Sequence, residues 1–263
     1  MISSILTTLP MTPLYAAEKA TSSLPTWEAG LAMGGASLPQ YMGSDARYTF
    51  AAPIPYIIYR GDRVNVDRNG LRADLFDIDG LSVDASLGVG LPVRNTNVAR
   101  QGMPSLQFSV QAGPRLNWKA LESTHDILTL RIPARAVLDI TGNYLGIVSE
   151  PDLIWEHQLS SKVSTKFSAG MLFAQQRYNG YYYSVDPIYA NPLRPSYQAQ
   201  GGLHSLSVSS ALGWAFQSNW QLFAAMRYRN LNSGVVHNSP LVKTPHYLSV
   251  AFGITWGFYQ SDR

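Results

Sequence analysis

Long stretches in which every second residue is apolar constrain the fold of this chain more than any other feature. After Ser218-Asn219, for example, such an alternation runs from Trp220 to Tyr228. In the preceding residues 206–217, the even-numbered and odd-numbered positions differ, and we call each such alternating set of positions a parity. One parity is small or polar, and the other is largely bulky and apolar, with Leu206, Val208, Leu212, Trp214 and Phe216. Because side chains of a strand point alternately to two faces, this pattern predicts a long antiparallel hairpin with one apolar face.

The same alternation recurs along most of the chain, at residues 27–34, 81–91, 106–118, 162–173 and 246–258. Many of these segments exceed the usual strand length of about five or six residues. They reach the roughly nine to eleven residues that a tilted strand needs to cross a bilayer. The non-apolar parity is rich in Gly, Ser and Ala, which suits the crowded inside of a barrel better than a water-facing sheet. We therefore favour a membrane barrel over a soluble β-sandwich, with Leu212, Val250 and Ile254 facing lipid and Gly213 and Gly253 facing the lumen.

The connections alternate in length. Short turns are predicted at Gly61-Asp62, Asp79-Gly80, Ser160-Ser161 and Ser218-Asn219, and long polar loops near 38–47, 92–104, 177–200 and 232–245. This asymmetry is typical of outer-membrane barrels, whose short turns are periplasmic and whose long loops are extracellular. The predicted fold is an all-β, transmembrane antiparallel β-barrel over residues 18–263. Its twelve predicted strands lie near 27–37, 48–60, 63–68, 71–78, 81–91, 105–118, 126–140, 145–158, 162–176, 202–217, 219–231 and 246–259.

Composition agrees with this interpretation. Charged residues make up only 14% of the chain, against a usual share of about 25%, and no apolar run is long enough for a transmembrane helix. The absence of cysteine excludes disulfides, thiolate catalysis and cysteine-ligated metals. Scattered basic residues and a net charge of +3 argue against nucleic-acid binding. Residues 1–17 are interpreted as a signal peptide or a disordered segment.

Three stretches resemble the MipA/OmpV family of Gram-negative outer-membrane proteins, whose best-known branch contains the MltA-interacting proteins. They are WEAGLAMGGASLPQYMGSD from Trp27, PIPYIIYRGDRVNVDRNGLRADL from Pro53 and YLSVAFGITWGFY from Tyr247. The resemblance implies a barrel in the cell outer membrane. For its best-known branch it implies a scaffold that tethers a lytic transglycosylase and a peptidoglycan synthase. It implies no catalytic residue and no cofactor.

Charged residues on the inward parity concentrate around mid-chain. Two interpretations stay open: a salt-bridge network that fills and stiffens the lumen, and a constriction that selects small solutes. The residues are Arg115, Arg131, Arg135, Asp139, Glu150, Asp152, Glu156, Lys166, Arg227 and Arg229.

The loop from Arg177 to Gln198 is rich in tyrosine and proline. It is interpreted either as an interfacial girdle that continues into a rigid extracellular loop, or as a binding surface for a glycan or a protein. We expect that deleting Tyr181 to Pro192 leaves the barrel folded. The tyrosines are Tyr178, Tyr181, Tyr182, Tyr183, Tyr189 and Tyr197.

Catalysis is the least favoured function. His204-Ser205 resembles a nucleophile pair, but adjacent residues of a strand should point to opposite faces. No histidine pair has the spacing of a metal site, so neither a metal nor another cofactor is predicted. The favoured function is a scaffold or interaction protein of the outer membrane, in contact with its lipid. A narrow channel for small solutes and a surface adhesin are the alternatives.

Overall fold

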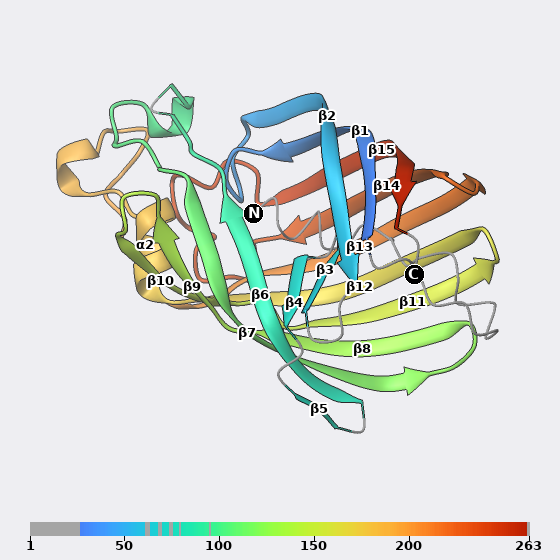
Figure 1. Ribbon diagram of the computed structural model, residues 1–263. Helices are drawn as coiled ribbons and strands as arrows, with labels where there is room; N and C mark the ends of the chain where they lie inside the picture. The colour runs from blue at the N-terminus through green and yellow to red at the C-terminus, as the bar shows by residue number, and fades with distance from the viewer. Residues whose placement is uncertain are drawn as a thin grey trace.

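A closed antiparallel sheet forms the body of the protein (Figure 1). The computed structural model describes residues 27–60, 64–67, 70–73, 76–78, 80–94 and 96–261. The predicted signal segment 1–17, the predicted turn Gly61-Asp62 and Asp79 of the turn Asp79-Gly80 lie outside the described residues. The other two predicted short turns join strands as expected.

The sheet contains fifteen strand segments. In chain order they are β1 (Trp27–Pro39), β2 (Arg47–Arg60), β3 (Val64–Asp67), β4 (Gly70–Ala73), β5 (Phe76–Ile78), β6 (Leu81–Gly90), β7 (Ser109–Glu122), β8 (Asp126–Pro133), β9 (Arg135–Asp139), β10 (Tyr144–Ser149), β11 (Asp152–Ser160), β12 (Val163–Ala174), β13 (Gly202–Gln217), β14 (Trp220–Asn230) and β15 (His246–Gln260).

These segments make up the twelve antiparallel strands that the sequence predicts. β4 and β5 belong to one predicted strand, as do β8 and β9, whereas the predicted eighth strand is divided into β10 and β11. Pro133 and Pro151 stand at two of these interruptions, and proline cannot donate to a strand ladder.

The ladder closes on itself. β1 pairs with both β15 and β2, and β2 continues through β3 to β4. β4 contacts β6, and β6 pairs with both β5 and β7, which leads back through β8, β11 and β12. The predicted barrel is therefore confirmed.

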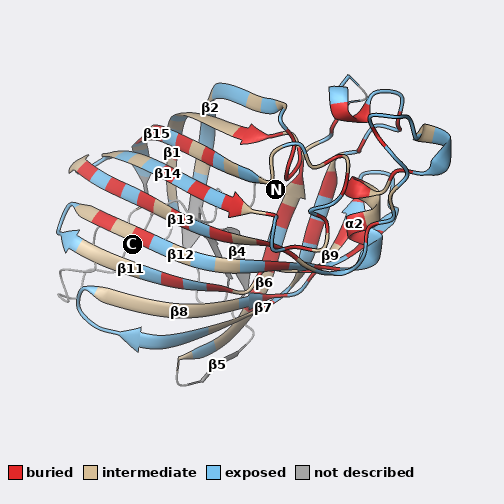
Figure 2. Cartoon of the chain, turned by 180° about the vertical axis from the view of Figure 1, so that it is seen from behind, coloured by how far each residue is buried: buried red, intermediate tan, exposed pale blue. Residues whose placement is uncertain are grey.

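The barrel is apolar outside and small or polar inside, as predicted. Leu212 and Trp214 are exposed, whereas Ala211 and Ala215 on either side of them, and Gly213 between them, are buried. The same alternation of exposed and buried positions is visible along β12 to β15 in Figure 2. Because a barrel in a bilayer meets hydrocarbon on its outer face, these exposed apolar side chains face lipid.

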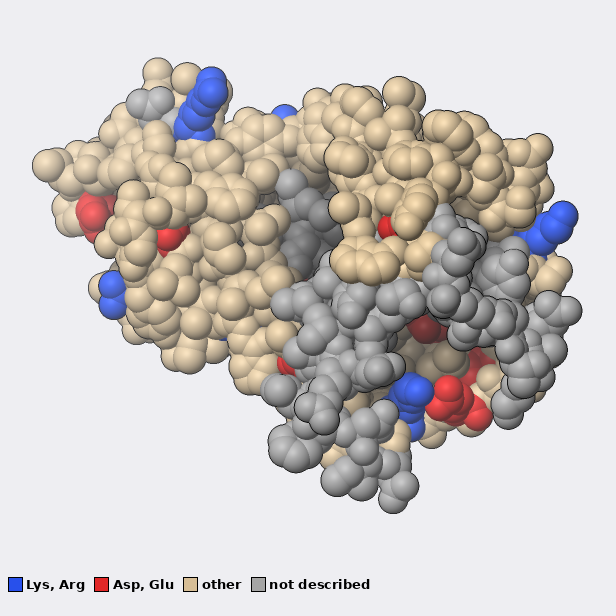
Figure 3. Space-filling view, in the orientation of Figure 1, with Lys and Arg blue, Asp and Glu red and all other residues tan. Residues whose placement is uncertain are grey.

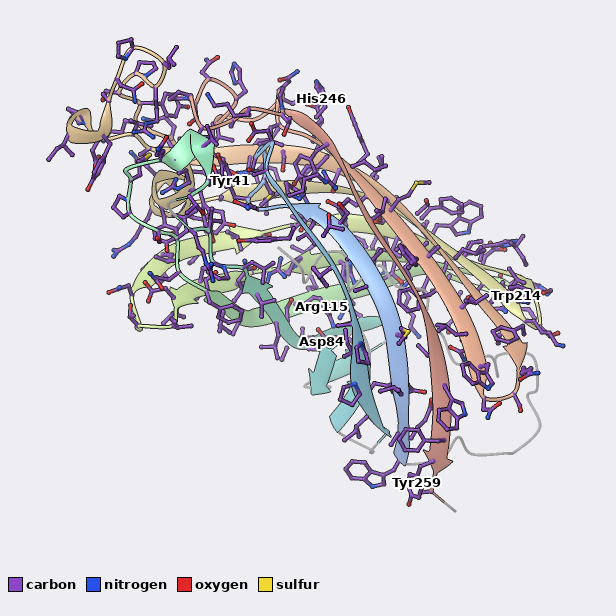
Figure 4. All side chains as sticks on the ribbon, turned by 90° about the horizontal axis from the view of Figure 1, so that it is seen from above. Tyr41, Asp84, Arg115, Trp214, His246 and Tyr259 are labelled. Atoms are coloured by element: carbon purple, nitrogen blue, oxygen red, sulfur yellow. The ribbon has the colours of Figure 1, made fainter. Side chains whose placement is uncertain are left out.

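Tryptophans gather at the end of the barrel where the short turns lie. All six occupy strand positions close to this short-turn end: Trp27, Trp118, Trp155, Trp214, Trp220 and Trp256. Trp220 stacks on Trp256 with ring centroids 5.7 Å apart. Figure 4 shows Trp214 and Tyr259 at this end and Tyr41 and His246 towards the opposite, long-loop end. The tryptophans form one aromatic belt at a membrane–water interface.

A hydrophobic core fills the long-loop end. The long loops carry a short helix, α2 (Gln176–Tyr183), and two 3-10 turns, η1 (Val98–Arg100) and η2 (Pro187–Tyr189). None of the described helices has the length and apolar character needed to span a bilayer. Side chains from the loops pack with the ends of β9, β10 and β12, and we call this cluster the cap: Tyr41, Met42, Val93, Met103, Leu106, Val137, Leu145, Val148, Leu172, Ala174, Tyr178, Tyr182, Tyr183, Val185, Ala199, Leu231, Val236 and Leu241.

Candidate functional site

Cross-strand ion pairs line the inside of the barrel. Arg131 on β8 lies directly opposite Asp152 on β11, and its guanidinium donates to both carboxylate oxygens. Glu156 and Lys166 are opposite each other on β11 and β12 and form a second pair. Both pairs follow from the register, because opposite charges on facing inward positions meet across the ladder.

A third pair includes a residue that the sequence analysis did not select. Asp84 on β6 faces Arg115 on β7, with oxygen–nitrogen distances of 2.6 and 2.7 Å. The two residues lie together within the barrel in Figure 4. Asp84 occupies the inward parity of its segment, so the alternation contained the signal that identifies it as a lumenal charge.

Glu150 connects distant parts of the chain. It lies between β10 and β11, and its Oε1 atom accepts from Arg227, at 3.2 Å, and from Arg229. All three side chains are buried. Figure 3 shows acidic and basic atoms inside a hollow at the lower right, whereas the tan faces around it carry few charges. We call the residues Arg131, Arg135, Glu150, Asp152, Arg227 and Arg229 the charge layer.

Two of the predicted network residues form no ion pair with the described residues. Asp139, at the end of β9, accepts four hydrogen bonds from Thr141 and Asn143 and thereby orders the turn before β10. Its assignment to the lumenal network is wrong, because local backbone and side-chain donors satisfy its carboxylate. Arg135 faces inward and is buried, yet its Nε atom has no hydrogen-bond partner among the described residues.

The expectation that His204 and Ser205 diverge is also wrong. The ladder between β12 and β13 shifts register here: Phe173 is opposite Leu203, and Leu172 is opposite Ser205. His204 is therefore the extra residue of a β-bulge, which turns its side chain to the same side as Ser205. Its Nδ1 atom lies 2.9 Å from Ser205 Oγ, and both residues are fully buried. The pair is closed to a substrate in this structure.

The same pair links the charge layer to the cap. Arg229 donates to Ser205 Oγ at 2.8 Å, and Tyr183 donates its hydroxyl to the carbonyl of Met42 at 2.9 Å. The remaining contact joins His204 Nε2 to Tyr183 Oη at 2.9 Å. With a neutral ring, only one arrangement satisfies every atom: Ser205 donates to Nδ1, and Nε2 donates to Tyr183. A continuous hydrogen-bonded chain thus runs from β14 to the first long loop.

The predicted binding tyrosines do not form one exposed surface. Tyr178, Tyr182 and Tyr183 are at most 2% exposed, and they point into the cap. The interpretation of a binding surface is therefore wrong for these three, because α2 turns its aromatic face towards the barrel. Tyr181, Tyr189 and Tyr197 are half-buried against the same core.

The exposed apolar residues of the long loops lie elsewhere. Ile188 and Leu193 are almost fully exposed, as is Val98 on the neighbouring loop. Arg194 holds the two loops together, since its buried guanidinium donates to the carbonyls of Ala99 and Gln101 at 3.1 and 2.9 Å. We call Val98, Ile188 and Leu193 the loop tip.

Comparison with known proteins agrees with this architecture. The family described as MltA-interacting protein MipA matches residues 31–258, which covers the barrel from β1 to β15. The chain belongs to the MipA family. It is an outer-membrane β-barrel of the Gram-negative type. A comparison with curated protein sequences found no match.

Solved structures with a similar course of the chain are also membrane proteins. An outer membrane channel from Pseudomonas putida F1 is 10% identical, with 94% of this chain and 100% of that chain covered and a TM-score of 0.49. The translocator domain of the autotransporter NalP from Neisseria meningitidis is 13% identical, with 91% and 90% covered and a TM-score of 0.47. A bacterial polysaccharide outer membrane secretin is 11% identical, with 88% and 98% covered and a TM-score of 0.46.

Proposed function

We propose that this MipA-family barrel is a closed scaffold that holds peptidoglycan-remodelling enzymes at the outer membrane. The observation that carries this proposal is the cap. Its large side chains, among them Tyr41, Tyr178 and Tyr183, are withdrawn from solvent and occupy the barrel mouth. A mouth packed as a hydrophobic core suits a rigid platform better than an open transport path.

The family description supplies the class of partner, because it names an interaction with MltA. The partners we propose are a lytic transglycosylase and a peptidoglycan synthase, which work on the periplasmic side. The short-turn end should face them, since short turns of outer-membrane barrels are periplasmic. This end presents the β7–β8 turn at 123–125 and the β11–β12 turn at 161–162.

Capture of the enzymes by the refolded barrel tests the scaffold. We expect the immobilised protein to retain a purified lytic transglycosylase of the MltA type. Replacing residues 123–125 and 161–162 with Gly and Ser should weaken capture at least tenfold. The matched control, Ile188→Ser with Leu193→Ser at the loop tip, should not. Equal capture by both variants, or no capture by the native barrel, would reject the proposed role.

Conductance in a planar bilayer tests the closure separately. The native barrel should be silent, because the cap and the charge layer lie in series along the lumen. A steady open-state current would instead favour the narrow channel.

The loop tip supports the adhesin as a second candidate. Val98, Ile188 and Leu193 expose apolar surface on two loops that Arg194 fastens together. A preorganised apolar surface of this kind suits contact with a partner. Loss of cell-surface attachment in the Ile188→Ser, Leu193→Ser variant, with enzyme capture unchanged, would assign adhesion to this surface.

A further inference from the structure

We propose that the lumen holds a binding site for a small oxyanion, a carboxylate or a phosphate group, centred on Arg135. Arg135 belongs to β9 and is 8% exposed. It lies within electrostatic reach of Glu150, Asp152 and Arg131 in the charge layer. The inference is independent of the scaffold role.

The charge layer contains more cations than anions. It has four guanidinium groups, those of Arg131, Arg135, Arg227 and Arg229, and two carboxylates, those of Glu150 and Asp152. Both oxygens of Asp152 accept from Arg131, and Glu150 accepts from Arg227 and Arg229. The layer therefore has two more guanidinium groups than carboxylates, and neither of its carboxylates forms an ion pair with Arg135.

Arg135 also has an unused donor. Its Nε atom is buried and has no hydrogen-bond partner among the described residues. A buried charge without an acceptor is costly, so folded proteins supply one from the chain, from water or from a ligand. An oxyanion in contact with Arg135 would supply both a compensating charge and the missing acceptor.

The chemistry of the ligand follows from the donors. A guanidinium presents a planar fork whose geometry matches the paired oxygens of a carboxylate or a phosphate. Gly88 borders this fork, since a Cβ atom there would stand 3.3 Å from Arg135 Nη1. The side chain of Gln111 flanks the same point, with its acceptor atom Oε1 3.0 Å from that position. The site lies deep between β6, β7 and β9, so the oxyanion must be small.

Stability at matched ionic strength tests the site. The refolded barrel would be unfolded with urea in chloride, in inorganic phosphate or in acetate. At about ten times its Kd, a bound oxyanion should raise the ratio of folded to unfolded protein about tenfold. A gain in phosphate alone or in acetate alone identifies the preferred group, and a gain in both identifies the shared fork chemistry. No gain over chloride in either anion would overturn the proposal.

Two variants separate a specific site from a general salt effect. Arg135→Gln should abolish the gain, whereas Arg177→Gln, at an exposed arginine of α2, should retain it. An equal gain in both variants would overturn the proposal.

The charge balance of the native protein also predicts the direction in which two variants change the free energy of unfolding, independently of any added oxyanion. In chloride, Arg135→Gln should be more stable than the native protein, because it removes a buried charge that forms no ion pair with any described carboxylate. Arg131→Gln should be less stable, because it leaves Asp152 without its partner. A loss of stability in Arg135→Gln would show that Glu150 already compensates Arg135, and it would overturn the proposal.

Discussion

At the scale of single residues, lipid and lumen impose different limits on substitution. Leu212 faces lipid on β13, so Leu212→Arg should cost on the order of 2–4 kcal/mol near the bilayer midplane. The measurement is urea unfolding from lipid vesicles. Unchanged stability in Leu212→Arg would contradict the outward orientation of this parity.

The inward glycine Gly253 leaves little room for a larger side chain. A Cβ atom there would lie 2.7 Å from the Met33 carbonyl oxygen and 2.7 Å from the Phe223 ring. Small size alone predicts an inexpensive Gly253→Ser change, but Phe223 packs over the glycine inside the barrel. We now expect Gly253→Ser to cost about 1–3 kcal/mol, typical of an overpacked site. The same unfolding experiment checks it, and a cost near zero would show that Phe223 moves freely.

At the scale of elements, the cap should respond to high pH. Burial raises the pKa of Tyr41 and of Tyr182 to about 12. Between about pH 10 and pH 12 the unfolded form loses protons that the folded cap retains, so stability falls as pH rises. Each tyrosine should lower the free energy of unfolding by up to about 1.4 kcal/mol per pH unit in this window. Below pH 10 the stabilising contribution of each tyrosine is fully present.

Tyrosinate absorbance during an alkaline titration measures this response. The pKa values of Tyr41 and Tyr182, raised by burial, should give a late phase near pH 12 that accompanies opening of the loops. Tyr41→Phe with Tyr182→Phe should reduce the amplitude of the late phase, and the other buried cap tyrosines, Tyr178 and Tyr183, should retain the rest. A single titration of all tyrosines near pH 10 would contradict the buried cap.

The side of the membrane that the long loops face remains a prediction, and one exposed loop residue tests it. Asn191 lies between η2 and Arg194 and is exposed. In this cysteine-free chain, Asn191→Cys provides a unique thiol. We expect it to react with a membrane-impermeant maleimide on intact cells, because long barrel loops are extracellular. Labelling only after the outer membrane is broken would invert the topology.

At the scale of the whole molecule, the cap should decide whether the barrel conducts. Deleting Tyr181 to Pro192, which we expect to leave the barrel folded, also removes Tyr182 and Tyr183 from the cap. We expect the strands to persist while the mouth opens, with current across a planar bilayer. Deleting only Pro187 to Pro192 keeps both tyrosines and should remain silent. Silence of both deletions would show that the charge layer alone closes the lumen.

Sequence by itself determined the barrel, because strand geometry repeats every two residues and a bilayer requires an apolar outer face. That period revealed the lipid-facing parity, the twelve strands and the inward charges. Ion pairs between facing positions, such as Arg131 with Asp152, also follow from hairpin register alone.

Only the tertiary structure decided which residues depart from the alternation of outward and inward positions, and which distant residues meet. The bulge at His204, the approach of Glu150 to arginines 77 and 79 residues away, and the burial of three loop tyrosines all depend on contacts between distant segments. No local period encodes such contacts, because packing at the barrel mouth is set jointly by several loops. Arg135 shows the limit most clearly: its sequence position predicts an inward charge, but only the tertiary structure shows that the described carboxylates form ion pairs with other arginines.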